Sequence, residues 1–137
     1  MKKVLIIDGQ GGRIGKMLAE RLLALEDVEI TAVGTNSIAT SAMMKAGVAR
    51  GATGENPVVV LSKDADVIAG PVGIVMADSM LGEITEKMAA AVSRSRAEKV
   101  LIPVAKCQTH VAGAKEISLS ALIDDAAEKI ALLIKNT

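Results

Sequence analysis

The sequence predicts an α/β domain in which a mostly parallel sheet is covered by helices on both faces. Short apolar runs begin near residues 4, 28, 66 and 99, and such runs are typical of strands buried on both sides. The segments between several of them repeat apolar residues at helical spacing. The chain has 137 residues, 50% of them hydrophobic, which is enough for one domain with its own core. We therefore expect residues 1–137 to form a single domain.

The first part of the chain contains two predicted strands and two predicted helices. Residues 4–7 read Val-Leu-Ile-Ile, and the apolar positions 14, 17, 18, 22 and 25 indicate a helix over 13–25. Residues 28–34 form the second strand. Thr35, Asn36 or Ser37 is expected to cap a helix that runs to about Ala46.

The second part contains one ambiguous region. Residues 47–57 read as a loop, and both 58–61 and 66–69 resemble strands. Only residues 62–65 separate these two runs, too few for a parallel crossover of a dozen or so residues. One run is therefore an edge or hairpin piece, or no strand at all, and we favour 66–69 as the central strand. A helix over 83–95, a strand over 99–103 and a helix over 120–135 complete the pattern.

Right-handed crossovers then give a small Rossmann-like three-layer fold, with the strand at residue 4 beside those at 28 and 66. Ligands of such sheets bind beyond the carboxyl ends of the strands. The loops at 8–15, 34–40, 70–82 and 103–113 are therefore the candidate site loops.

The composition excludes some classes of function. The 16 basic and 16 acidic residues balance, and no basic face is evident, which argues against nucleic-acid binding. The chain lacks Phe, Tyr and Trp, so it has no aromatic platform for a base, and the case for a flavin is weakened. One cysteine fits a reducing compartment, and no apolar stretch suits a membrane span. We expect a cytoplasmic protein with neither nucleic acid nor membrane as a partner.

The strongest local pattern is the stretch D-G-Q-G-G-R-I-G at residues 8–15. Its spacing fits a tight turn that leads into a helix whose open N-terminus offers N–H groups to an anion. Arg13 and Lys16 oppose the helix dipole there at a cost of about 0.3–1 kcal/mol each, which a bound anion would offset. The alternative is a purely structural turn. The candidate cofactor-binding residues of this loop are Gly9, Gln10, Gly11, Gly12, Arg13, Ile14 and Gly15.

A second candidate cluster, Gly34, Thr35, Asn36 and Ser37, follows the second predicted strand. NAD-binding domains of this kind usually carry an acidic residue here for the ribose hydroxyls. Its absence argues against ordinary NAD use, although Thr35 or Asn36 could bond a ribose. The same polar residues could form a second anion site or simply cap the following helix.

Three weaker candidates for catalysis are Asp78, Cys107 and His110. Asp78 and Ser79 could cap the helix predicted at 83 or face a substrate. Cys107 and His110 could form an activated thiol pair, although a lone cysteine is more often a buried apolar residue. A zinc site needs three or four ligands, and the chain has one Cys and one His, so no metal site is expected. The polar segment 51–56 could close over the crevice or be an ordinary surface loop.

Two resemblances extend these patterns. G-Q-G-G-R-I-G-K-M-L resembles the opening signature of dihydrodipicolinate reductases, which implies a nicotinamide dinucleotide loop at Gly9, Gly12, Arg13 and Gly15 but carries over no catalysis. The segments I-D-G-Q-G-G, A-V-G-T-N-S-I-A-T-S-A-M, G-A-T-G-E-N, G-P-V-G-I-V-M-A-D-S, L-G-E-I-T and L-I-P-V-A-K-C are similar to a bacterial family known as domain of unknown function 3842. That resemblance implies a Rossmann-like fold and no activity.

We therefore expect a protein that binds a nucleotide or dinucleotide such as NAD or NADP, or another phosphorylated small molecule, at the glycine-rich loop. The alternatives are a small oxidoreductase or other nucleotide-dependent enzyme, and a partner-binding protein with an empty loop. A homo-oligomer is expected, because it would cover the Met-rich and Ala-rich faces at 43–44 and 88–92.

Overall fold

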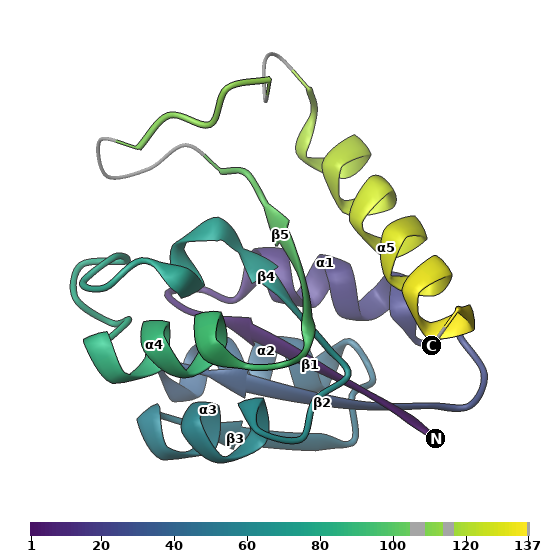
Figure 1. Ribbon diagram of the computed structural model, residues 1–137, viewed down its shortest axis with the longest axis horizontal. Coiled ribbons are helices and arrows are strands. Elements are labelled where there is room, and N and C mark those ends of the chain that lie inside the picture. Colours follow the sequence, from purple (N-terminus) through teal and green to yellow (C-terminus); the bar gives the residue numbers. More distant parts are fainter. Residues whose placement is uncertain (105–108, 114–116, 137) are drawn as a thin grey trace.

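The computed structural model describes residues 1–104, 109–113 and 117–136. Its core is a five-stranded parallel sheet in the order β3-β2-β1-β4-β5 (Figure 1). The strands are β1 (Lys2–Asp8), β2 (Val28–Gly34), β3 (Arg50–Thr53), β4 (Val67–Pro71) and β5 (Glu98–Ile102). The predicted fold class is confirmed, and β1 lies between β2 and β4 as expected.

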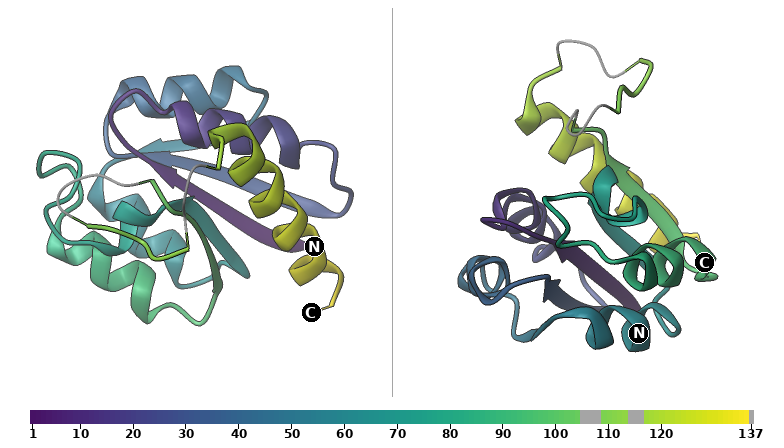
Figure 2. Two further views of the ribbon diagram at one scale, coloured as in Figure 1. Left: turned by 90° about the horizontal axis from the view of Figure 1, so that it is seen from above. Right: turned by 90° about the vertical axis from the view of Figure 1, so that its left-hand side faces the viewer.

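Helices cover both faces of this sheet (Figures 1 and 2). The helices are α1 (Arg13–Leu22), α2 (Ser37–Lys45), α3 (Glu55–Ser62), the short 3-10 helix η1 (Val72–Val75), α4 (Glu86–Arg94) and α5 (Leu119–Lys135). One apolar cluster joins α1, α2 and α5 to one face of the sheet, and a second joins α3, η1 and α4 to the other. No helix in the described part of the chain is long and apolar enough to cross a membrane.

The ambiguous region at 47–61 contains an edge strand and a helix. The expectation of a loop over 47–57 was wrong, because Arg50–Thr53 forms β3 beside β2 and α3 begins at Glu55. Residues 58–61 are part of α3 and no strand, because β3 and β4 are parallel and need a crossover between them. Val58 is fully buried and Val60 is 51% exposed, so the apolar run packs at helical spacing despite its β-branched residues.

The structure corrects two expectations, one about the helix at 83–95 and one about the apolar faces at 43–44 and 88–92. The helix begins at Glu86 rather than near residue 83, and Thr85 caps it by accepting a hydrogen bond from the Met88 amide. In the faces at 43–44 and 88–92, Met43, Met88, Ala89 and Val92 are buried within the chain itself, whereas Met44 is 41% exposed. The four buried side chains therefore give no argument for an oligomer, which stays a prediction.

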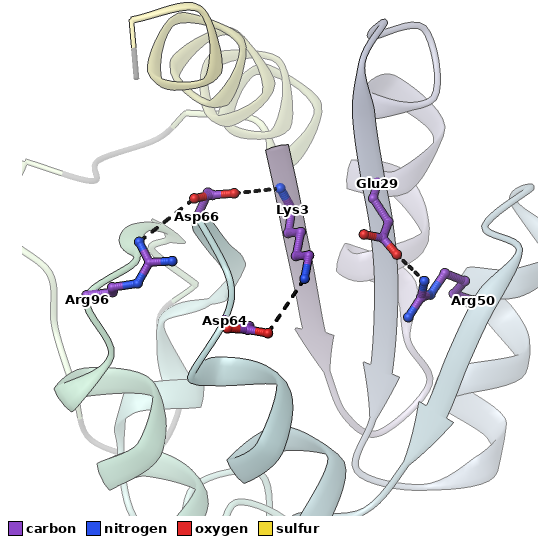
Figure 3. A network of polar contacts seen from close by, with 6 residues as sticks. All are labelled: Lys3, Glu29, Arg50, Asp64, Asp66 and Arg96. Carbon is purple, nitrogen blue, oxygen red and sulfur yellow. Dashed lines mark hydrogen bonds and ion pairs between the residues drawn. The ribbon is translucent and has the colours of Figure 1, made fainter. Parts of the chain in front are cut away.

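Charged side chains tie the strands together at the amino edge of the sheet. They are Lys3, Glu29, Arg50, Asp64, Asp66 and Arg96 (Figure 3). Asp66 accepts the Lys3 amide at 2.8 Å and lies 3.9 Å from Arg96, which links the starts of β1, β4 and β5. Such partly exposed pairs each contribute about 0–1 kcal/mol. This edge is a structural scaffold, and the sequence-predicted loops gather at the opposite edge.

Candidate functional site

The glycine-rich loop lies at the carboxyl edge of the sheet, beside the point where the strand order turns from β1 to β4. It forms one wall of a pocket of about 230 Å³, lined by Asp8, Gly9, Gln10, Gly11, Gly12, Arg13, Ile14, Pro71, Met80, Val104 and Leu119. Larger hollows of about 480 and 600 Å³ lie between α3 and α4 and between β5 and α5, and neither borders this loop. A crevice at the switch point of a parallel sheet is where ligands usually bind. This pocket is therefore the main candidate site.

Three glycines of the loop are needed for the packing of the chain on itself. Gly12 has a φ of 72°, and a Cβ there would lie 2.8 Å from the Cα of Ala39 in α2. A Cβ on Gly15 would lie 2.5 Å from the sulfur of Met43, and one on Gly9 would also meet atoms closer than 3 Å. The spacing G-x-x-G-x-x-G thus follows from the fold and does not by itself indicate a ligand.

Gly11 differs from these three glycines. A Cβ added to Gly11 would meet no atom within 4 Å, so nothing in the described structure requires a glycine there. Gly11 lines the pocket, and its N–H group has no acceptor among the described residues; the same holds for the N–H groups of Arg13 and Ile14. These three donors are available to an anion at the start of α1.

The buried carboxylate of Asp8 binds two other amides of the glycine-rich loop. Asp8 is 4% exposed, and its Oδ1 and Oδ2 accept the N–H groups of Gly9 and Gly15, each at 2.7 Å. A carboxylate at this place is favoured by the dipole of α1 and satisfies two otherwise buried donors. A bound anion would therefore use the remaining donors, which are the N–H groups of Gly11, Arg13 and Ile14.

The side chains of Arg13 and Lys16 are exposed at the first turn of α1, and neither forms an ion pair with a described residue. No acidic residue lies in this turn to offset them. Both cations lie where they oppose the helix dipole, as the sequence predicted. A negatively charged ligand in the pocket would attract both cations and so offset their unfavourable interaction with the helix dipole.

The end of β2 receives a carboxylate from a distant part of the chain. Glu83, in the segment between η1 and α4, accepts three hydrogen bonds at its Oε1. The donors are the Gln10 amide at 2.8 Å, the Thr35 hydroxyl at 2.5 Å and the Asn36 side-chain amide at 3.0 Å. The sequence has no acid near Asn36, but the fold places one there.

The hydrogen bonds to Glu83 also set its ionisation. Partial burial alone would raise the pKa of Glu83, but the bonds from Thr35, the Gln10 amide and Asn36 outweigh it. The pKa of Glu83 therefore lies below its ordinary value of 4.5, so the side chain is a carboxylate at neutral pH.

Asn36 and Gly34, from the cluster at 34–37, have structural roles in the described structure. Asn36 caps α2 by accepting the Ala39 amide at 2.9 Å, one of the two alternatives that the sequence left open. Gly34 is required because a Cβ there would lie 2.4 Å from the amide nitrogen of Thr40. Ser37 is exposed at the first position of α2.

The two weaker catalytic candidates that the structure describes, Asp78 and His110, are not among the residues that line the pocket. Asp78 is exposed with a φ of 66°, and it does not cap α4. Ser79 is buried and donates its hydroxyl to the Gly73 carbonyl at 2.6 Å. His110 is exposed, and Cys107 lies outside the described residues. Among the described residues no group of three or more His, Cys, Asp or Glu side chains could hold a metal ion.

Sequence reasoning missed the two carboxylates that shape the site. Asp8 ends a strand directly before the glycines, and an acid at the carboxyl end of a predicted central strand is a signal that could have identified it. Glu83 gives no local signal, because its partners are as far as 73 positions away in the chain. Met80 lines the pocket from the same segment as Glu83.

Comparisons with known proteins identify the family of this chain. Residues 3–135 match the family model described as a domain of unknown function, DUF3842. A search of curated proteins gave no match. Among solved structures, the chain is similar to a dodecameric FMN-dependent Ubix-like decarboxylase from Escherichia coli O157:H7, with a TM-score of 0.48 and 15% identity. That similarity covers 97% of this chain and 76% of the decarboxylase chain, and at this distance it bears on no residue of the site. Since the family model spans nearly the whole chain, the protein belongs to the DUF3842 family.

Proposed function

We propose that this protein binds a phosphorylated small molecule, such as a nucleotide, through one phosphate group at the glycine-rich loop. The observation that carries the proposal is the set of N–H groups of Gly11, Arg13 and Ile14, which line the switch-point pocket and have no acceptor among the described residues. Amides without an acceptor at the positive end of a helix dipole favour a phosphate.

The size of the pocket favours a phosphate and part of its carrier over a whole dinucleotide. Its volume is about 230 Å³, whereas pockets for drug-sized ligands measure about 300–1,000 Å³. The end of β2, where the adenosine ribose of a dinucleotide lies in related folds, is occupied by Glu83. NAD and NADP are therefore weaker candidates than a ligand that presents a single phosphate.

The neighbouring carboxylate of Asp8 does not oppose this assignment. Both of its oxygens already accept amides of the loop, so its charge is balanced by the start of α1. Arg13 and Lys16, which form no ion pair with a residue that the structure describes, add positive charge at the same helix turn.

The decisive variant is Gly11→Ala, measured by isothermal titration calorimetry with inorganic phosphate and with AMP. Its methyl group enters open space in the protein, so the fold is retained, but it stands where a phosphate would contact the loop. We expect wild-type protein to bind and Gly11→Ala to lose at least about tenfold in affinity, which corresponds to about 1.4 kcal/mol.

The charge of the site is tested by Arg13→Glu. Its control is Arg94→Glu, which changes the net charge equally at the last turn of α4. We expect weaker binding only for Arg13→Glu. An absence of binding to phosphate, AMP and NAD by wild-type protein would contradict the proposal and leave the loop as a structural turn.

A further inference from the structure

Glu83 fills a small anion site made by other parts of the chain. Three donors from the glycine-rich loop and the end of β2 converge on its Oε1: the Gln10 amide, the Thr35 hydroxyl and the Asn36 side-chain amide. The fit is close, because a Cβ on Gly9 would lie 2.9 Å from this same oxygen. Three donors around one negatively charged oxygen form the kind of site that also holds a phosphate oxygen.

The segment 76–85 that carries Glu83 has an unfavourable backbone. Asp78, Met80 and Leu81 have φ values of 66°, 57° and 57°, all in the left-handed region that non-glycine residues rarely adopt. Leu81 is 93% exposed, so its side chain gains almost nothing from packing. Contacts such as the three hydrogen bonds to Glu83 offset this conformational cost. The backbone of the segment is also anchored by the fully buried Ile84 and by the hydrogen bond from Ser79 to the Gly73 carbonyl, so the Glu83 side chain can leave its donors without the whole segment moving.

We propose that the donors around Glu83 are a second anion subsite, and that the second phosphate of a diphosphate ligand displaces the Glu83 carboxylate from it. The inference rests on the proposed function, because the first phosphate takes the Gly11, Arg13 and Ile14 amides. Gln10 belongs to both places, because its amide bonds Glu83 and the residue lines the pocket beside Gly11, and on that ground we take the two subsites as adjoining. Two phosphates joined by one oxygen match two adjoining subsites, which points to a diphosphate group.

The Glu83 side chain then determines the affinity for a diphosphate. A carboxylate in the second subsite repels an incoming phosphate and occupies its donors, so a diphosphate binds only when the Glu83 side chain leaves those donors. A single phosphate in the pocket requires no such movement. Glu83 thus determines whether the site distinguishes a diphosphate from a monophosphate.

The test compares inorganic phosphate with pyrophosphate by isothermal titration calorimetry on the full chain. Glu83→Ala removes the carboxylate, and Glu83→Gln removes the charge while keeping an acceptor for the three donors. The matched control is Glu86→Gln, an exposed acid in the first turn of α4. Circular dichroism confirms that each variant is folded.

We expect Glu83→Ala to bind pyrophosphate at least about tenfold more tightly than wild-type protein does. This factor corresponds to a wild-type subsite that is open about a tenth of the time or less. The gain should be larger for pyrophosphate, which uses both subsites at once, than for phosphate, Glu83→Gln should fall between, and Glu86→Gln should match wild type. An unchanged ratio of pyrophosphate to phosphate affinity in Glu83→Ala overturns the inference while leaving the proposed function intact.

The two proposals fail in different ways. If wild-type protein binds no phosphate but Glu83→Ala binds pyrophosphate, the second subsite stands and the single-phosphate function does not. If no variant binds either probe, both are wrong. The same series with AMP and ADP then shows whether the diphosphate is recognised as part of a nucleotide.

Discussion

The Oδ2 of Asp8 accepts the backbone N–H of Gly15 at 2.7 Å, so the last residue of β1 holds the first turn of α1. The other oxygen of Asp8 accepts the Gly9 amide at the same distance. One carboxylate thus closes the turn from both ends, and it does so while 4% exposed.

This contact predicts the effect of Asp8→Asn. Asparagine has one acceptor oxygen, so the amide of Gly9 or Gly15 loses its partner inside the protein. We expect a loss of about 1–3 kcal/mol in the free energy of unfolding, the usual cost of an unsatisfied buried donor. Urea denaturation followed by circular dichroism measures it. Asp64→Asn is the control, because the Asp64 side chain is 76% exposed and its change should stay within about 0.5 kcal/mol. Equal values for both variants would show that Asp8 does not hold the turn.

The glycines of the loop should separate into two classes by stability. Gly12→Ala forces an alanine to a φ of 72° and its Cβ to 2.8 Å from the backbone of α2, whereas Gly11→Ala meets open space. We expect Gly12→Ala to destabilise the protein by more than about 1 kcal/mol and Gly11→Ala to change stability little. Differential scanning calorimetry of the two variants is sufficient. Similar melting temperatures would mean that the loop tolerates side chains at both positions.

Asn36 has two roles that substitution can separate. Its Oδ1 caps α2 at the Ala39 amide, and its Nδ2 donates to Glu83. Asn36→Ala should cost about 0.5–2 kcal/mol of stability through the lost cap. Asn36→Asp keeps the cap but places a second negative charge beside Glu83, so it should speed hydrogen exchange in segment 76–85. Adding Glu83→Gln to Asn36→Asp should remove most of that increase, and a failure to do so would show that the two side chains are not coupled.

The Glu83 contact should weaken only in acid. Because hydrogen bonds from Thr35, the Gln10 amide and Asn36 hold the pKa of Glu83 below 4.5, its stabilisation is fully present above that value. It is lost as the pH falls through the lowered pKa of the folded protein. The amide proton of Gln10, observed by NMR, should shift with a midpoint below 4.5 and should not shift in Glu83→Gln. A midpoint above 4.5 would contradict the assigned contacts.

Much of the fold could be predicted from local patterns. The apolar runs that became β1 and β2 were located correctly, because buried strands need continuous apolar residues. Residues 50–62 could not be read in this way. Arg50–Thr53 is an exposed edge strand without an apolar run, and the β-branched run at 58–60 lies in a helix because two parallel strands must be joined.

The sequence by itself determined where the glycine-rich loop lies, which residues form it, and that two cations follow it. These features depend on residues close together in the chain. Only the tertiary structure decided which loop amides remain available, because Asp8 and Glu83 take some of them. It also placed a carboxylate at the end of β2, where the sequence has none, by bringing Glu83 to Gln10 across 73 positions. Hydrogen bonds depend on distance in space, and that distance is set by how the strands and helices pack.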